Sequence, residues 1–558
     1  MFLQQLLPLL LLITFFRQSA APPAPLPPKP DAFRISGRVI DGVTGQPISR
    51  ASVALNSSNS SNAPNLADSG RFELTDGQGL FAFAGVPPGK YVLSARRRGY
   101  IPQTYQQHEF FTTAIVVGPG LQSENLTFSL RPGSSISGVV VDESGDPLRH
   151  AGVMLFRRMI SGGASRILQV RNDSTDDEGR YHFSHLDPGT FFVGVSAQPW
   201  YAQHNVRPLV NQVTQISDNS WTRQIVEQNL SLDVAYPVAF YSNAADLSGA
   251  TPVVLRSGEV AIADFQMHPV PAARILVKTS APGADQPPNL SLVQPLAEDV
   301  NTYLPTQYNQ VAPGLMEITG VPRGRFNLVV ETQQGDATTR QSRSVQLEND
   351  AEVDVTQASA AAVVSGVMRV DDGSPVPQPA RVRLRSSVTG ESTDTVVSPT
   401  GEFSFKNNPA DIGSYELVII EPQGLFIRNL SSTGAKISGR SFQITSAQDL
   451  TITINASKGS GHITGTALKN DKPASGVMIV LAPLDLRSNT ALFRRDQSDS
   501  DGTFSLNAIV PGRYNLMAIE DGWDLEWGNP DVLKKFLPSS ESVEIAPHQR
   551  SDFKVNVQ

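Results

Sequence analysis

The chain has 558 residues, of which 40% are hydrophobic and 18% charged, and its formal net charge is −8. This composition fits folded domains. The mild charge, with Arg96 to Arg98 as the only basic run, argues against a nucleic-acid partner, since phosphate binding relies on clustered Lys and Arg. The absence of cysteine excludes disulfides, thiol catalysis and a lipid-modified cysteine anchor.

The N-terminus predicts export. Residues 6–16 form an unbroken apolar run ahead of the small residues Ala20 and Ala21, and the run is too short to span a bilayer comfortably. We therefore expect a signal peptide at residues 1–21. No Lys or Arg precedes the apolar run, so an uncleaved membrane anchor is the alternative. Residues 22–31 are Pro-rich and predict a stiff spacer. The protein is then secreted, periplasmic or on the cell surface.

A pattern of two glycines recurs five times along the chain. Each copy has a Gly with apolar residues two and four places later, and a second Gly with an aromatic two places on and an aliphatic four on. Alternation with a period of two predicts two half-buried strands joined as a hairpin. Repetition at intervals of roughly 100 residues predicts domains in series instead of a solenoid. The copies begin at Gly79, Gly179, Gly314, Gly401 and Gly502.

A second motif opens four of the five modules. A β-branched residue and a hydroxyl residue precede a glycine, and a turn rich in Asp, Gly and Pro follows, before the next alternating strand. These glycines are Gly37, Gly138, Gly366 and Gly465. Short strands, frequent turns and no helical period predict an all-β chain of about five tandem antiparallel β-sandwich modules, Ig-like or transthyretin-like. Pro530–Phe536 is the best candidate for a short helix.

We place the modules at residues 32–132, 133–270, 271–360, 361–458 and 459–558. The second module contains a long insertion, residues 199–255, which is rich in aromatic residues and is either functional or poorly ordered. The third module opens with Ala273, Arg274 and Ile275 and has no glycine in this opening strand, so we interpret it as a diverged copy.

These motifs resemble the carboxypeptidase regulatory-like domain. The resemblance is carried by the opening strand of Gly37 and Val39, the Asp/Gly/Pro turn, the acidic turn before Gly79 and the Pro88-Gly89-Lys90-Tyr91 strand, with their counterparts downstream. It covers nearly the whole chain after Pro30 and is specific in modules 1, 2, 4 and 5. It implies a transthyretin-like or prealbumin-like sandwich, grouped with starch-binding-like folds. It also implies secreted bacterial arrays that act as spacers, docking surfaces or carbohydrate-binding units, and it implies no peptidase activity.

The motifs of common catalytic sites are missing from the sequence. There is no His-Glu-x-x-His, no Gly-x-Ser-x-Gly and no phosphate-binding glycine loop, so we predict no enzymatic activity and no cofactor. Closely spaced carboxylates in the turns before the glycine pairs are weak Ca²⁺ candidates, and the alternative is that these residues cap their turns. They are Asp176, Asp177, Asp499 and Asp501.

Aromatic loops form the candidate ligand site. Sugars can pack their apolar C–H faces on aromatic rings, and nearby carboxylates can accept hydrogen bonds from hydroxyl groups. The alternative is that these rings plug the open ends of the sandwiches. The candidates are Trp523 and Trp527 with Asp524 and Glu526 beside them, and Trp200, Tyr201 and Trp221 in the module 2 insertion.

The sequence favours a non-enzymatic exported binding protein that contacts polysaccharide or cell-envelope material through aromatic loops. A structural spacer or protein-docking scaffold that uses exposed edge strands is one alternative. An accessory chain to a separate enzyme or transporter is another. We expect membrane contact only through an uncleaved signal segment.

Overall fold

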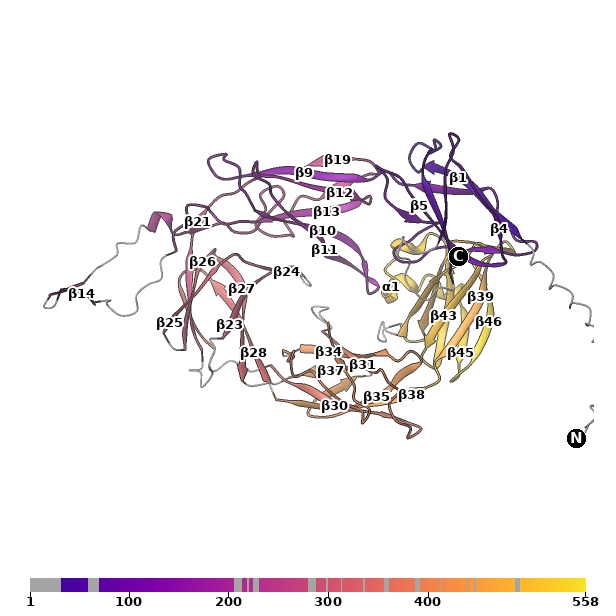
Figure 1. Ribbon diagram of the computed structural model, residues 1–558. Helices are drawn as coiled ribbons and strands as arrows, with labels where there is room; N and C mark the ends of the chain where they lie inside the picture. The colour runs from indigo at the N-terminus through magenta and orange to yellow at the C-terminus, as the bar shows by residue number, and fades with distance from the viewer. Residues whose placement is uncertain are drawn as a thin grey trace, which may run out of the picture.

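The computed structural model describes residues 32–58, 70–204, 213–217, 220–223, 230–279, 288–297, 300–312, 314–334, 337–355, 361–386, 392–411, 413–438, 440–445, 448–486 and 492–558. The predicted signal peptide and Pro-rich spacer lie outside these residues. The described chain is all-β, as predicted, with its larger sheets in pairs that make tandem sandwiches. The modules follow one another around a closed ring in which module 1, indigo in Figure 1, meets module 5, yellow.

Modules 1 and 2 each pair a sheet built on the opening strand with a sheet built on the second strand. Module 1 contains β1 (Phe33–Asp41), β2 (Ser52–Ser57), β3 (Arg71–Leu74), β4 (Leu80–Val86), β5 (Gly89–Arg96), β6 (Gln103–Thr104), β7 (Ile115–Val117) and β8 (Leu126–Leu130). Module 2 contains β9 (Ser134–Val141), β10 (Gly152–Ser161), β11 (Ala164–Ser174), β12 (Arg180–Leu186), β13 (Gly189–Ser196), β14 (Val213–Ser217), β15 (Ser220–Arg223), the 3-10 helix η1 (Leu230–Leu232), β16 (Val234–Ala235), β17 (Ala239–Phe240), β18 (Val253–Leu255), β19 (Val260–Ile262), β20 (Phe265–Gln266) and β21 (Val270–Pro271).

Modules 3 to 5 repeat this two-sheet arrangement. Module 3 contains β22 (Ala273–Lys278), β23 (Asn289–Ala297), β24 (Val300–Tyr303), β25 (Gln307–Ala312), β26 (Leu315–Val321), β27 (Gly324–Gln334), β28 (Ala337–Leu347) and β29 (Ala351–Asp354). Module 4 contains β30 (Val364–Val370), β31 (Arg381–Ser386), β32 (Ser392–Val396), β33 (Glu402–Ser404), β34 (Gly413–Glu421), β35 (Leu425–Thr433), β36 (Lys436–Ser438), β37 (Ser441–Ile444) and β38 (Leu450–Lys458). Module 5 contains β39 (Gly461–Lys469), β40 (Lys472–Pro473), β41 (Met478–Pro483), β42 (Arg494–Gln497), β43 (Thr503–Ile509), β44 (Gly512–Ile519), η3 (Gly522–Asp524), α1 (Pro530–Leu533), η4 (Leu537–Ser539), β45 (Glu541–Ile545) and β46 (Arg550–Asn556).

The two strands of each glycine pair do not form a hairpin, so that prediction was wrong. In module 1, β4 pairs with β1 in one sheet, whereas β5 pairs with β2 in the other. The connection between β4 and β5 therefore carries the chain from one sheet to the other. Period-two alternation predicts one buried face per strand but does not indicate which sheet the strand joins. The short helix expected near Pro530 is present as α1.

Strand pairing is antiparallel except where the opening strand meets the closing strand of its module. β1 runs parallel to β8, β30 to β38 and β39 to β46. This pairing explains the repeated glycine, because a Cβ at that position would collide with the carbonyl oxygen of the closing strand. The distance to that oxygen would be 2.2 Å at Gly37, 2.1 Å at Gly138, 1.8 Å at Gly366 and 2.5 Å at Gly465.

The aromatic residue of the glycine pair covers this bare backbone from the neighbouring strand. The rings of Tyr181, Phe403 and Phe504 would lie within 2.9 Å of a Cβ on the glycine that they face. Module 3 differs at both positions. Val277 stands where the other modules have the glycine, and its partner Met316 stands where they have the aromatic residue. An aromatic ring over a glycine restores the apolar surface that the glycine lacks, so a valine at this position removes the need for the ring. Module 3 therefore fills this position with a valine and a methionine instead of a glycine and an aromatic ring.

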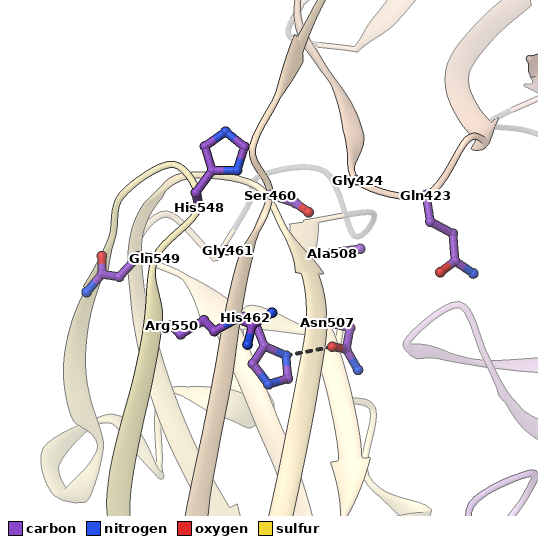
Figure 2. A pocket seen from close by; sticks show the side chains of 10 residues that line it. All are labelled: Gln423, Gly424, Ser460, Gly461, His462, Asn507, Ala508, His548, Gln549 and Arg550. Carbon is purple, nitrogen blue, oxygen red and sulfur yellow. Dashed lines mark hydrogen bonds between the residues drawn. The ribbon is translucent and has the colours of Figure 1, made fainter. Parts of the chain in front are cut away.

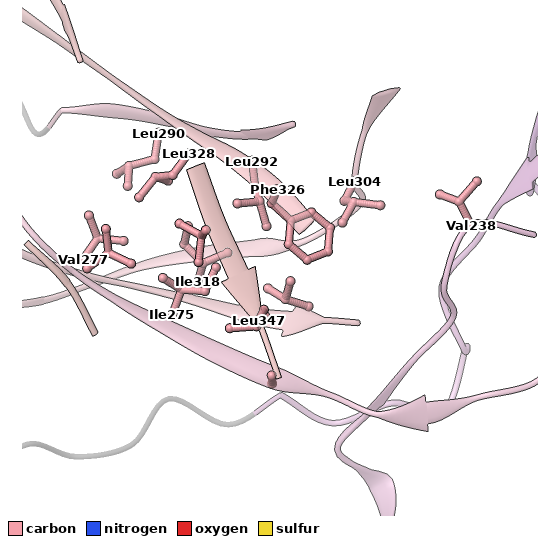
Figure 3. Close-up of a cluster of buried hydrophobic side chains, with 14 of the residues drawn as sticks. Val238, Ile275, Val277, Leu290, Leu292, Leu304, Ile318, Phe326, Leu328 and Leu347 are labelled. Atoms are coloured by element: carbon pink, nitrogen blue, oxygen red, sulfur yellow. The ribbon is translucent and has the colours of Figure 1, made fainter. Parts of the chain in front are cut away.

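Residues 230–255 of the module 2 insertion form part of the junction with module 3. β17 adds to the module 2 sheet beside β13, and β18 pairs with the same strand. Val238, Phe240, Leu247 and Ala250 belong to one buried cluster with the core of module 3, including Phe326 and Leu328 (Figure 3). Residues of the insertion between 238 and 250 therefore pack against the core of module 3.

A buried ionic network lies at the same junction. Asp233 accepts a hydrogen bond from Arg274 at 2.5 Å and lies 2.9 Å from Nδ1 of His204, while Arg274 lies 3.8 Å from Glu317. These side chains are nearly inaccessible to solvent. Removal of one partner from a buried ion pair leaves an uncompensated charge, so this network fixes module 3 against module 2.

No helix in the described residues is long and apolar enough to cross a bilayer.

The close approach at the opening strand generates a test. We expect Gly37→Ala to lower the free energy of unfolding of module 1 by about 1–3 kcal/mol, because the new methyl group overlaps the Leu126 carbonyl. Gly77→Ala is the matched control, since nothing lies within 4 Å of its Cβ position, and its effect should stay within about 0.5 kcal/mol. Hydrogen exchange of module 1 amides in the full chain measures both. Equal effects of the two substitutions would contradict the close-packing explanation.

Candidate functional site

Trp523 lies under cover, at the contact between module 5 and module 1. One face of the sheet containing β41, β42, β44 and β45 is apolar and carries the segment with η3, α1 and η4. Only 8% of Trp523 is exposed. Its Nε1 donates a hydrogen bond to the carbonyl oxygen of Gly476 at 3.3 Å. This placement leaves no open ring face for a ligand. Trp523 packs on the outer face of the sheet and outside the cluster that fills the sandwich, so it does not plug the open end of the sandwich either.

Two rings from module 1 complete the cover on Trp523. The imidazole of His108 stacks on the indole with ring centroids 4.7 Å apart and an interplanar angle of 3°, and the Phe111 ring lies 5.4 Å away. His108 is held in this position by the amide oxygen of Gln497, 3.1 Å from Nδ1. The contact therefore joins Trp523 into one aromatic cluster with two rings that lie more than 400 positions earlier in the sequence.

Arg495 links the rings of Trp527 and Phe111. Its guanidinium carbon lies 4.5 Å from the Trp527 centroid and 5.1 Å from that of Phe111. The same guanidinium makes a bidentate ion pair with Glu109 of module 1, at 2.8 and 3.2 Å. A guanidinium between two rings combines cation–π and ionic attraction. Trp527 therefore also belongs to the contact between modules 1 and 5.

Asp499 joins the two modules by ionic and backbone contacts. It accepts hydrogen bonds from Nζ of Lys90 at 2.5 Å and from the backbone nitrogen of Ala114 at 3.0 Å. Burial raises the pKa of Asp499, and the Lys90 cation opposes that rise. Asp501 caps its own turn instead, by accepting from the nitrogen and hydroxyl of Thr503.

The other predicted residues of this loop have separate environments. Glu526 accepts a hydrogen bond from the backbone of Ser165, at the tip of the β10–β11 hairpin, at 3.1 Å, and this bond lowers its pKa together with one from Asn529. The Gly528 nitrogen also donates to the Gly163 carbonyl at 2.9 Å. The module 2 hairpin therefore reaches across the ring to module 5 (Figure 1). Asp524 is exposed and takes no part in these contacts.

The calcium candidates in module 2 have ordinary turn and surface contacts. The Asp176 carboxylate accepts hydrogen bonds from the backbone nitrogens of Glu178 and Arg180, and these bonds lower its pKa. Asp177 lies 3.9 Å from Arg149 on the surface. Among the described residues, no three His, Asp or Glu side chains lie close enough together to hold a metal ion.

Trp200, another predicted residue, lies at an open cleft between modules 2 and 3. This cleft has a volume of about 1040 Å³ and is bounded by β10 and β11, by residues 196–204 and by β24 with the loop after it. Two aromatic side chains on its lining are well exposed: Trp200 at 80% and Tyr303 at 72%. The polar residues of the lining are Arg149, His150, Gln169, Asn172, Asp173, Ser196, Gln198, His204, Asn301, Thr302 and Gln307.

Tyr201 supports Trp200 from behind and is not itself part of this lining. Its ring meets that of Trp200 edge-on at 5.7 Å. Its hydroxyl donates to Glu143 at 2.5 Å, and the hydroxyl of Tyr236 donates to the other oxygen of the same carboxylate at 2.8 Å. Burial, with the nearby Glu143, raises the pKa of Tyr201 to about 12, whereas the two hydroxyl hydrogen bonds help to lower the pKa of Glu143 against the effect of its burial. These bonds anchor Tyr201, the neighbour against which Trp200 lies.

The structure thus does not bring the seven aromatic and acidic candidates into one site. Trp523, Trp527 and Glu526 form a contact within the chain, while Trp200 lines a cleft; the backbone of Trp221 lies in β15, and its side chain is outside the described residues. Sequence reasoning missed His108, Phe111, Lys90 and Arg495, because only the tertiary structure brings them to module 5. It also missed Tyr303, which lies in the diverged module and follows no motif.

The carboxypeptidase regulatory-like domain family matches residues 34–131 and 135–218. The chain therefore contains two such domains in tandem, and the predicted resemblance is confirmed for modules 1 and 2. A search of curated protein sequences found no match.

Solved structures with similar parts include three bacterial proteins. An ancillary pilin of Streptococcus is 12% identical, with 51% of this chain and 99% of that chain covered and a TM-score of 0.17. The minor pilin GBS52 of Streptococcus agalactiae is 14% identical, with 35% and 95% covered and a TM-score of 0.19. The TIE protein of Bacillus anthracis is 10% identical, with 77% and 75% covered and a TM-score of 0.16.

The aromatic contact between modules 1 and 5 predicts that Trp523→Ala opens the ring. Replacement of a large buried aromatic residue costs about 3–5 kcal/mol, and here the loss also removes the surface on which His108 and Phe111 rest. Small-angle X-ray scattering of the full chain should show a larger radius of gyration. Phe72→Ala is the control, because Phe72 is 71% exposed on β3 of module 1. An unchanged radius for Trp523→Ala in a folded chain would refute the role of this contact in closure.

Asp496 predicts a pH dependence of stability. Burial raises its pKa from 3.8 to about 6. A folded-state pKa above the ordinary value means that the protonated carboxyl favours folding, so this stability is full below pH 3.8 and is lost as the pH rises through 6. Between pH 4 and 7, the free energy of unfolding of the wild-type chain should fall by up to about 3 kcal/mol relative to that of Asp496→Asn. Urea unfolding at both pH values measures this difference, and parallel losses in both proteins would contradict the assignment.

Proposed function

We propose that this protein is an exported, non-enzymatic binding protein that holds a saccharide in the cleft between modules 2 and 3. The observation that carries the proposal is the 80% exposure of Trp200 at that cleft. Exposure of a large apolar ring costs free energy in water, so a fixed and exposed tryptophan in a concave site favours a ligand that covers it. Export rests on the apolar run at residues 6–16 of the sequence.

The chemistry of the lining supports a sugar as this ligand. Two exposed aromatic rings can cover the apolar C–H faces of pyranose units, while amides such as Asn172, Gln198 and Asn301 can both donate to and accept from hydroxyl groups. The volume of about 1040 Å³ exceeds that of a typical small-molecule pocket, and a segment of a polysaccharide fits it better than one monosaccharide.

The same lining supports binding without turnover. Hydrolysis of a glycosidic bond uses a pair of carboxyl groups on opposite sides of the bond. Asp173 is the one carboxylate among the described residues that line the cleft. It supplies half of such a pair, which supports a binding role over a hydrolytic one.

The closed ring argues against the spacer alternative. A spacer gains length by extending its modules in a line, whereas here modules 1 and 5 contact each other through Lys90 and Asp499, and through His108 and Trp523. Ring closure shortens the span of the chain and holds the junctions between modules in fixed positions, which suits a binding protein.

The proposal predicts that Trp200→Ala weakens saccharide binding at least about tenfold, or about 1.4 kcal/mol. Binding of residues 22–558 to a panel of soluble and insoluble polysaccharides, followed by titration calorimetry with the best ligand, measures this loss. Phe110→Ala is the matched control, since it removes an exposed aromatic ring from module 1. Saturable binding that Trp200→Ala leaves unchanged would refute the cleft as the site, and no binding across the panel would refute the function.

A docking function has one observation in its favour. Strand β3 ends its sheet in the described part of module 1, and its side chains Phe72 and Leu74 are 71% and 63% exposed. An apolar edge strand is a surface that another chain can extend by strand pairing. If the saccharide panel is negative, crosslinking at this strand is the experiment to make next.

A further inference from the structure

Strand β3 of module 1 carries its apolar side chains on the side away from the sandwich core. Val53 is fully buried and lies opposite Glu73. Directly opposed residues share a face of a sheet, so the side of β3 toward the core carries Glu73, and alternation puts Phe72 and Leu74 on the outer side. Both of these side chains remain exposed in the closed ring, at 71% and 63%. The strand therefore presents an apolar surface to solvent.

The corresponding strands of modules 2 and 5, β11 and β42, carry polar side chains at these two positions. They are Asn172 and Ser174 on β11, and Arg495 and Gln497 on β42. In module 5 both residues contact module 1, since Arg495 pairs with Glu109 and Gln497 with His108. The outer face of this strand is thus a contact surface in module 5, and module 1 has apolar residues in the same place.

The free edge of β3 presents backbone groups of the same two residues. The Thr75 nitrogen donates to the Ala51 carbonyl at 3.0 Å, on the side of β2. Backbone groups of successive residues point to opposite edges of a strand, so those of Phe72 and Leu74 point away from β2. In the described part of the sheet β3 is the last strand. Another strand can therefore add here by hydrogen bonding.

The side of β3 toward the core carries one charge of each sign. Arg71 and Glu73 are both exposed. The Arg71 guanidinium donates to the Ala84 carbonyl at 2.7 Å and lies over the Phe83 ring, 5.6 Å from its centroid. Charged side chains that point inward normally keep other strands from an edge. A strand with the reverse order of charges would match them, and the edge would then accept that strand.

A second, antiparallel copy of β3 has this reverse order. When two copies pair about Phe72, its nitrogen and carbonyl bond to those of the partner's Phe72, and Leu74 lies opposite the partner's Gly70. Arg71 then lies opposite the partner's Glu73, and Glu73 opposite the partner's Arg71, where side chains approach most closely. A shift by two residues in either direction keeps the hydrogen-bonding pattern but opposes two Glu73 or two Arg71 side chains. The charges therefore select one register.

We propose that a second copy of this chain pairs with β3 in this register, so that the module 1 sheets of two copies become one continuous sheet. The contact has two-fold symmetry, because the same residues act on both sides. On the outer face the two Phe72 rings lie next to each other, and each Leu74 is diagonal to the ring of the other copy, so the apolar surface is covered. The contact does not depend on the saccharide cleft.

Sedimentation velocity of residues 22–558 over a series of concentrations tests the proposal. We expect a monomer that converts to a dimer as the concentration rises. Glu73→Arg sets two arginines opposite each other and Arg71→Glu sets two glutamates opposite each other, so each variant alone should weaken the dimer at least about tenfold. An equimolar mixture of the two variants restores both ion pairs and should form a heterodimer.

Glu402→Arg is the matched control, since Glu402 is an exposed glutamate on β33, at the end of a sheet in module 4. It should dimerise as the wild type does. Circular dichroism and thermal unfolding establish that each variant is folded. The scattering comparison of Trp523→Ala with Phe72→Ala applies to the monomer, at concentrations below this association.

A monomer at every concentration would overturn the proposal, and so would a dimer that Glu73→Arg leaves intact. Two folded variants that stay monomeric when mixed would refute the assigned register. Saccharide binding by Glu73→Arg separates this proposal from the proposed function, because the substitution lies outside the cleft lined by Trp200.

Discussion

The arrangement of the whole molecule depends on the need to cover one apolar sheet face in module 5. Every residue of β41 is buried, so both faces of this strand require neighbours. One of the two faces points away from the sandwich core. The segment with η3, α1 and η4 covers part of that face, and Phe111 of module 1 packs against the same cluster. Burial of this surface supplies the free energy that holds the first and last modules together.

Specific polar contacts fix the position of module 1 on module 5. The ion pairs of Lys90 with Asp499 and of Glu109 with Arg495 join module 1 to module 5. Separation of the modules would expose the apolar face and would also break these partly buried ion pairs. The contact therefore behaves as a core within the chain, and its tryptophan is a packing residue.

Closure also explains why the candidate ligand site lies between modules. The connection of modules 4 and 5 is two residues long (Figure 2), and modules 2 and 3 share a hydrophobic cluster and a buried ionic network. Rigid junctions of this kind can hold side chains from two sandwiches in a fixed geometry. The cleft between modules 2 and 3 is such a place, since Trp200 comes from one sandwich and Tyr303 from the other.

The sequence by itself determined the features that depend on neighbours along the chain. Alternating apolar residues, turn residues and the missing helical period predicted an all-β chain of repeated sandwiches, and the paired motifs around Gly37 and Gly79 predicted where strands begin. These features are local, because strand faces and turn geometry follow from a few consecutive residues.

The tertiary structure alone decided which strands share a sheet and which loops meet. Period-two alternation is the same for a hairpin and for two strands in opposite sheets. The sequence therefore could not show that β4 and β5 lie in opposite sheets. Trp200 and Trp523 have similar loop contexts in the sequence, yet one lines a cleft and the other is buried under His108. Burial of a loop residue is set by partners from distant modules, and no local pattern encodes that contact.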